Sequence, residues 1–112
     1  MEDCIFCKMV KGEIPCRKVY EDTGFLAFLD INPQAPVHVL VIPKKHVARL
    51  SETVDRELLG SLLSIASAIA ERENISGKGY RIVINTGREA GQTVDHIHLH
   101  LLGGRKMNWP PG

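Results

Sequence analysis

The segment His96-Ile97-His98-Leu99-His100-Leu101 places a histidine at every second position of a run that otherwise reads as a buried β-strand. Successive side chains of a strand point to opposite faces, so the three imidazoles share one face and the three aliphatic side chains share the other. Imidazole has an unperturbed pKa of about 6.5 and can act as a base, a nucleophile or a metal ligand at neutral pH. The alternation therefore predicts a strand with one face toward the core and one chemically reactive face.

Two alternatives to a nucleophilic role remain open for this row. One is a solvated sheet face that happens to carry histidines, although polar strand faces more often use Thr, Lys and Glu. The other is a catalytic zinc ion held by all three imidazoles. The residues elsewhere in the chain have to decide between these interpretations.

Length and composition exclude several classes of protein. A chain of 112 residues has the size of one domain with a single core, and we expect one domain over residues 1–112. With 14 Lys and Arg against 13 Asp and Glu, the chain lacks the basic excess typical of nucleic-acid-binding proteins. No apolar run approaches the roughly 18 residues of a membrane span, and no signal peptide is evident. We expect a cytoplasmic protein with no nucleic-acid or membrane partner.

The remaining apolar segments predict two helices and four further strands. Apolar residues recur at helical spacing over residues 54–73, which predicts one long helix. A short helix is expected at residues 5–11, because Gly12 and Pro15 follow it. The other expected strands cover residues 18–21, 25–29, 37–42 and 80–85. This order favours an α+β fold with one antiparallel sheet.

Cys4 and Cys7 have the two-residue spacing that lets two thiolates bind one tetrahedral zinc ion. Two more ligands are needed, and His46 together with one histidine of the row can supply them. The result would be a Cys2His2 site of the structural kind. The alternatives are two buried thiols or a thioredoxin-like redox pair, although no βαβ pattern surrounds these cysteines.

Residues suited to a phosphate and a nucleoside lie near the histidines. Gly91-Gln92-Thr93 can offer backbone amides and a hydroxyl to an anion, and Asn85 adds a neutral donor; turn formation is the alternative. Asp30 can accept hydrogen bonds from a ribose diol or can be an ordinary turn aspartate. An apolar slot for a flat base, or simply part of the core, would be formed by Phe6, Met9, Phe28 and Ile31.

Taken together, three segments of the chain resemble the histidine-triad superfamily: His38 within the segment from Ala35 to His46, the row from His96 to His100, and Leu101-Leu102-Gly103-Gly104 after it. More narrowly, the chain is similar to the histidine-triad nucleotide-binding proteins of the purine nucleoside phosphoramidase branch. The similarity extends over nearly the whole chain. It implies a five-stranded antiparallel sheet with one long and one short helix, paired as a two-fold dimer.

The resemblance also implies an activity. The expected reaction is hydrolysis of the P–N bond of purine nucleoside 5′-phosphoramidates through a nucleotidyl-histidine intermediate, with release of a nucleoside monophosphate. A dinucleoside polyphosphate hydrolase and a nucleotide-binding scaffold protein are the alternatives. Covalent catalysis by histidine requires no metal, and it splits one difficult displacement into two easier steps.

Site residues follow from the resemblance position by position. His98 matches the nucleophile, His100 the residue that contacts the phosphate and assists the leaving group, and His38 the residue that supports the nucleophile. A neutral His98 has to donate its other ring proton, and we expect a backbone carbonyl as the acceptor. The implied nucleotide-binding residues are Ile5, Phe6, Met9, Phe28, Asp30, Ile31, Asn85, Gly91, Gln92, Thr93, His98, His100 and Trp109.

Three details qualify this correspondence. Thr93 stands where many relatives have serine, so a hydroxyl is retained with an added methyl group. Trp109 is expected near the active site of the partner subunit. Some small bacterial-type members of the superfamily bind a structural zinc ion through a similar cysteine pair, which implies zinc ligands at Cys4, Cys7, His46 and His96.

Overall fold

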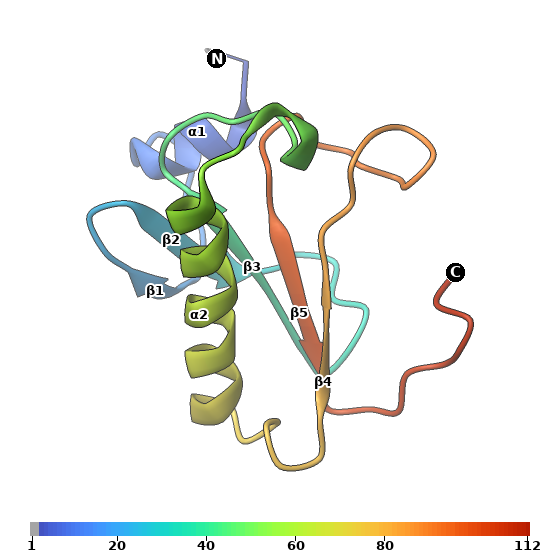
Figure 1. The fold of residues 1–112 in the computed structure, drawn as a ribbon. Coiled ribbons are helices and arrows are strands. Elements are labelled where there is room, and N and C mark those ends of the chain that lie inside the picture. The colour runs from blue at the N-terminus through green and yellow to red at the C-terminus, as the bar shows by residue number, and fades with distance from the viewer. Residues whose placement is uncertain (1–2) are drawn as a thin grey trace.

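The computed structural model describes residues 3–112; Met1 and Glu2, the first two residues of the expected domain, lie outside the described part. Five strands form one sheet in the order β1-β2-β3-β5-β4, and all neighbouring strands are antiparallel (Figure 1). The strands are β1 (Lys18–Glu21), β2 (Phe25–Leu29), β3 (Val37–Pro43), β4 (Tyr80–Val83) and β5 (Leu99–Gly103). The helices are α1 (Ile5–Val10) and α2 (Arg56–Arg72), with a short 3-10 turn at Leu50–Glu52. The predicted α+β fold is confirmed.

Helix α2 begins and ends at residues that satisfy its terminal backbone groups. The side chain of Asp55 accepts a hydrogen bond from the Leu58 amide at 3.0 Å, as an N-cap does. At the other end Asn74 adopts a φ of 60°, and the Ile75 amide donates to the Ala70 carbonyl at 3.0 Å. A residue in the left-handed conformation followed by such a backbone hydrogen bond is a common end of an α-helix. The helix is thus two residues shorter at its start than the apolar pattern predicts.

The two faces of the sheet have different coverings. Helix α2 packs on one face, where Val39, Val41, Leu99 and Leu101 belong to the larger apolar cluster (Figure 1). The opposite face carries a smaller cluster to which α1 contributes Phe6. Because side chains alternate along a strand, His38 on β3 and His100 on β5 lie on the face opposite α2. That face is where the histidines meet.

The histidine row differs from the prediction in one respect. Strand β5 begins only at Leu99, so His96, Ile97 and His98 precede it in an irregular segment. Neighbouring strand β3 ends at Pro43, which has no amide hydrogen to continue the ladder. The Ile97 amide instead donates to the Val47 carbonyl at 2.7 Å.

The alternation of the row nevertheless persists. Ile97, Leu99 and Leu101 are each at most 1% exposed within the cluster under α2. The expected strand over residues 80–85 is also shorter, because β4 pairs with β5 only as far as Val83 opposite His100.

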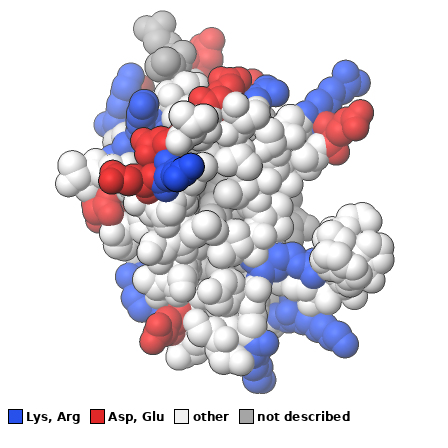
Figure 2. Space-filling model, viewed as in Figure 1, with Lys and Arg blue, Asp and Glu red and all other residues white. Residues whose placement is uncertain are grey.

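The described residues 3–112 contain no helix that combines the length and the apolar character needed to span a membrane. Lys, Arg, Asp and Glu side chains lie mainly around the edge of the face that α2 covers (Figure 2). The middle of α2, residues 58–70, carries no charged side chain. An uncharged exposed area therefore lies over the long helix.

Replacement of Val41 by Ala tests the core beneath α2. Val41 is fully buried, so removal of two methyl groups should lower the free energy of unfolding by about 2–3 kcal/mol. Val54 offers a matched control because it is 95% exposed, and V54A should change stability by less than about 0.5 kcal/mol. Urea unfolding monitored by circular dichroism measures both variants. Equal losses would contradict the assignment of Val41 to the core.

Candidate active site and metal centre

Three histidines from two strands and the segment before β5 form one cluster. In the sheet register Leu40 lies opposite His100 and His38 lies opposite Leu102, so the two histidines are diagonal neighbours on adjacent strands. His38 Nε2 lies 2.9 Å from His100 Nδ1, and the ring centroids of His98 and His100 are 5.0 Å apart. His38 and His98 are buried, whereas His100 is partly exposed. A reacting group can therefore approach from the side of His100.

The main chain determines which ring nitrogen of His98 carries the proton. His98 Nδ1 lies 2.8 Å from the His96 carbonyl oxygen, which can only accept a hydrogen bond. The neutral ring must then hold its proton on Nδ1 and keep an unshared electron pair on Nε2. The edge-to-face contact with Phe6, at a centroid distance of 5.2 Å, holds the ring plane. This is the arrangement that a nucleophilic imidazole needs.

The same reasoning gives a direction to the hydrogen bond between His38 and His100. The backbone amide of Gln34 donates to His38 Nδ1 at 3.0 Å, so the proton of neutral His38 is on Nε2. That proton points to His100 Nδ1, and the proton of His100 is then on its own Nε2. Asp30 Oδ2 is a second, more distant acceptor, 3.4 Å from His38 Nε2.

Burial keeps two of these rings neutral. Desolvation lowers the pKa of His38, and the Asp30 carboxylate only partly opposes this effect. Desolvation also lowers the pKa of His100 to about 4, with smaller contributions in the same direction from the neighbouring His98 and His38. Both imidazoles are therefore uncharged at neutral pH in the unliganded protein.

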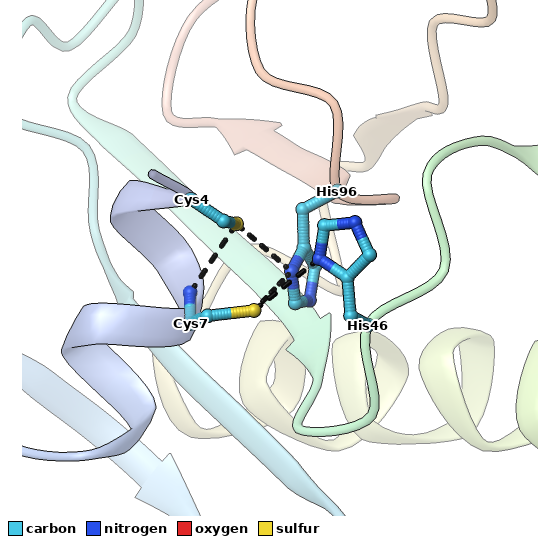
Figure 3. Close-up of side chains that lie close together, drawn as sticks. All are labelled: Cys4, Cys7, His46 and His96. Carbon is cyan, nitrogen blue, oxygen red and sulfur yellow. Dashed lines mark hydrogen bonds between the residues drawn. The ribbon is translucent and has the colours of Figure 1, made fainter. Parts of the chain in front are cut away.

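A second cluster joins α1 to the segments that follow β3 and precede β5 (Figure 3). Cys7 Sγ lies 3.2 Å from His46 Nδ1, and His96 Nδ1 lies 3.4 Å from Cys4 Sγ and 3.6 Å from Cys7 Sγ. Ligands at the usual Zn–S and Zn–N lengths of about 2.3 and 2.0–2.1 Å and tetrahedral angles are separated by about 3.5 Å. These three separations suit one zinc ion, and all four potential ligand atoms lie within 4.8 Å of one another.

Two further observations support the fit of this cluster to a metal. His96 Nε2 donates to the Pro43 carbonyl at 2.8 Å, which leaves the Nδ1 electron pair directed at the thiols. A hydrogen bond from the other ring nitrogen to a backbone carbonyl is typical of metal-binding histidines. Desolvation, followed by the neighbouring Cys4 thiol, raises the pKa of Cys7, an effect that a bound cation would reverse.

The geometry also bears on the alternative of one zinc ion held by the whole row. His96 belongs to the cysteine cluster, His100 groups with Asp30 and His38, and His98 joins neither group of potential ligands. Within the second group, the Gln34 amide keeps a proton on His38 Nε2, so this nitrogen has no electron pair free for an ion. The three imidazoles of the row therefore do not converge on one metal.

Four of the predicted nucleotide-binding residues line two hollows. One, of about 360 Å³, is lined by Asp30, Ile31 and His38 together with Arg17 and two prolines. The other, of about 390 Å³, is lined by Ile5 and Thr93 beside Cys4 and His46.

Three other apolar candidates belong to the smaller apolar cluster on the face opposite α2. Phe6 and Phe28 are buried in contact with each other at a centroid distance of 5.5 Å, and Met9 packs against their cluster. Ile31, by contrast, is 97% exposed.

The expected phosphate-binding loop has a more specific structure than its sequence suggests. The Gln92 amide group donates to the Ala48 and Val94 carbonyls at 2.7 and 3.0 Å and accepts from the Gly87 amide at 2.9 Å. This side chain therefore holds the loop closed. Gly91, with a φ of 85°, and Thr93 are exposed, and Asn85 is partly exposed after β4.

Two site features were missed in the sequence analysis. Arg17 lines the hollow beside Asp30, and a main-chain bond from Leu29 to its carbonyl places it there. The Gln34 contact to His38 uses the main chain, so no side-chain pattern could signal it.

Trp109 is 81% exposed in a C-terminal tail that runs away from β4 and β5 (Figure 1), and the Arg81 guanidinium lies 5.9 Å from its ring centre.

Comparisons with known proteins agree with this architecture. The model of the HIT domain family matches residues 11–107. A 14 kDa zinc-binding protein of Zea mays is 54% identical, over 96% of this chain and 87% of its own length. The crystal structure of a HIT family hydrolase from Legionella pneumophila superposes with a TM-score of 0.96 at 54% identity, covering 98% of this chain and 100% of that one.

A histidine triad nucleotide-binding protein from Candida albicans has a TM-score of 0.83 at 38% identity, covering 96% of this chain and 83% of that one. The family match spans most of the chain, and the relatives named here are covered over 83–100% of their own length. The chain belongs to the HIT domain family.

Proposed function

We propose that this protein hydrolyses purine nucleoside 5′-phosphoramidates through a covalent nucleotidyl-His98 intermediate. The observation that carries the proposal is the 2.8 Å hydrogen bond from His98 Nδ1 to the His96 carbonyl, which leaves Nε2 unprotonated beside His100. Membership of a family that includes hydrolases and nucleotide-binding proteins supports the substrate class. The reaction is a group transfer to histidine followed by hydrolysis.

In the first step His98 Nε2 forms a bond to the α-phosphorus while the P–N bond of the substrate breaks. The leaving nitrogen needs a proton, and we assign its delivery to His100, the ring adjacent to the nucleophile. The neutral ring carries its proton on Nε2, because Nδ1 accepts from His38, so Nε2 is the nitrogen that gives the proton to the leaving group. A general acid of this kind contributes about 10²–10⁴-fold to the rate.

In the second step a water molecule attacks the phosphorus of the intermediate. The bond between phosphorus and His98 Nε2 breaks, and His100 accepts the proton that the water loses. The products are a nucleoside monophosphate and the free enzyme. His38 keeps His100 in place throughout, through the hydrogen bond of 2.9 Å between their rings.

The nucleotide would lie along the face that carries these histidines. Asp30 and Ile31 line the hollow beside His38 and are our candidates for the ribose and base contacts. Ribose hydroxyls would share the Asp30 carboxylate with the Asn32 amide, which donates to Oδ1 at 2.8 Å. Asn85, Gly91 and Thr93 remain the candidates for the phosphate, since the Gln92 side chain is already occupied.

We further propose a structural zinc ion bound by Cys4, Cys7, His46 and His96. Support comes from the separations of the four ligand atoms and from the maize relative that is named as a zinc-binding protein. These residues would hold the ion away from the reacting atoms of His98 and His100. Its contribution would be to fasten α1 and His46 to the segment before β5.

A two-fold dimer is the third part of the proposal. Strand β4 has only one neighbour in the sheet of the described chain, and the middle of α2 is uncharged with Leu63 47% exposed (Figure 2). Pairing across this region would cover both features. The extended tail would then let Trp109 reach the active site of the partner subunit.

Replacement of His98 by Asn tests the nucleophile. The variant keeps a polar side chain of similar size but has no imidazole, so release of AMP from adenosine 5′-phosphoramidate should fall by more than about a thousandfold. Binding of AMP, measured by calorimetry, should change little. Mass spectrometry of the wild-type protein quenched during turnover should locate the nucleotidyl group on His98.

The outcomes discriminate among the candidate functions. An adduct on another residue, or undiminished hydrolysis by H98N, would overturn the mechanism. Release of AMP from dinucleoside polyphosphates but not from the phosphoramidate would favour the alternative hydrolase. AMP binding without hydrolysis of either substrate would favour a nucleotide-binding scaffold.

Elemental analysis tests the metal centre. Protein purified without chelators or metal-affinity resin should contain about one zinc ion per chain, and C7S should lose it and unfold at a lower temperature. Cys16 provides a matched control because it lies outside the cluster, so C16S should keep its zinc. Zinc-free wild-type protein, or equal zinc content in C7S, would show that the cluster is not a metal site.

The neutral state of His100 predicts a dependence of stability on pH. The unfolded chain protonates this ring near pH 6.5, whereas the folded chain keeps it neutral until about pH 4. The unfolded state therefore binds more protons in that interval, and the free energy of unfolding should decrease as the pH falls from 6.5 to 4. Urea unfolding should show a smaller decrease for H100N than for the wild type. Identical decreases would mean that His100 is not held neutral.

A further inference from the structure

The loop between β2 and β3 is held against the end of β5 by two independent contacts. Arg105 Nε donates to the Gln34 carbonyl at 2.9 Å. Gly104, with a φ of 91°, lies so close to the loop that an added Cβ would be 2.9 Å from Pro36 Cβ. Gln34, whose carbonyl Arg105 contacts, is also the residue whose backbone amide donates to His38 Nδ1. A surface arginine is thus two hydrogen bonds away from a candidate catalytic ring.

We propose that Arg105 is a positioning residue, which holds Gln34 so that its amide fixes the tautomer of His38 and thereby places the His100 proton on Nε2. The proposal rests on the function assigned above. Arg105 and Gln34 have no part in that function other than this positioning. Each link is a single hydrogen bond: Arg105 to Gln34 at 2.9 Å, Gln34 to His38 at 3.0 Å, and His38 to His100 at 2.9 Å.

The consequence of losing the first link follows from the chemistry of imidazole. A neutral ring has one N–H and one acceptor nitrogen, so a donor at Nδ1 obliges the proton to be on Nε2. If Gln34 shifts away, His38 can also exist with its proton on Nδ1 and an electron pair on Nε2. His100 would then donate from Nδ1 to His38, and its Nε2 would have no proton for a phosphoryl oxygen or a leaving nitrogen.

The surroundings of Arg105 indicate that its geometry matters more than its charge. Within residues 3–112 no carboxylate lies within salt-bridge distance of this guanidinium. Its two hydrogen bonds go to main-chain carbonyls, of Gln34 at 2.9 Å and of Lys106 at 3.1 Å. The rigid fork of arginine suits two carbonyls at once, whereas a lysine ammonium does not reproduce it.

Nitrogen NMR of histidine-labelled, unliganded protein tests the proposal directly. In the wild type the ¹⁵N shifts should identify His38 as protonated on Nε2 and His98 as protonated on Nδ1. R105Q and R105K should both show a mixture of tautomers at His38, while His98 stays unchanged because its acceptor is the His96 carbonyl. Q34P removes the donating amide itself and should give the same mixture, whereas Q34A keeps that amide and should keep the wild-type signal.

Steady-state kinetics supply the second readout. Loss of the ordered donor on His100 should lower kcat of R105Q by about tenfold with little change in KM, because general-acid assistance acts in the transition state. Lys106 is the adjacent exposed residue whose side chain has no partner in the described chain, so K106Q is the control and should behave as the wild type.

Several results would overturn the proposal. One is an unchanged His38 tautomer in R105Q and Q34P. Another is a simultaneous change at His98, which would indicate general loosening. The NMR experiment needs no substrate, so a wild-type protein that shows the expected tautomers but does not hydrolyse phosphoramidates would refute the proposed function and leave the role of Arg105 intact.

Discussion

One fully buried residue, His96, connects the parts of this molecule that matter for its chemistry. Its Nε2 donates to the Pro43 carbonyl at the end of β3, its Nδ1 faces the sulfurs of Cys4 and Cys7, and its carbonyl accepts from His98. A polar side chain with no exposed surface is tolerated only when its hydrogen-bonding groups are satisfied. The position of His98 therefore depends on the same residue that contacts the cysteines at the start of α1.

The sheet then supplies the spacing between the histidines. The register of β3 against β5 brings His38 and His100 together as diagonal neighbours, and packing of Ile97, Leu99 and Leu101 under α2 directs the imidazoles to the other face. Main-chain groups, rather than charged side chains, set the tautomers of His38 and His98. This is consistent with burial, because neutral rings with fixed hydrogen bonds cost less to bury than charged ones.

Much of this arrangement follows from patterns in the sequence. Period-two alternation identifies the face that carries the histidines, helical spacing identifies α2, and the Cys-x-x-Cys spacing identifies a cluster of potential metal ligands. Other features escape such patterns for physical reasons. The start of β5 depends on the missing amide of Pro43, a property of the neighbouring strand. The Gln92 amide binds the loop that contains it, and Gln34 acts through its backbone, for which any residue but proline would serve.

The histidines of this chain show how identical side chains come to differ in chemistry. A carbonyl acceptor leaves His98 with a free electron pair on Nε2, while an amide donor makes His38 a hydrogen-bond donor from that same nitrogen. His96, with a carbonyl at Nε2, has its electron pair on Nδ1, where the thiols lie. In each case the partner of one nitrogen determines what the other can do. The row of alternate histidines is therefore a set of differently protonated groups, and the surrounding backbone determines which nitrogen of each ring can donate and which can accept.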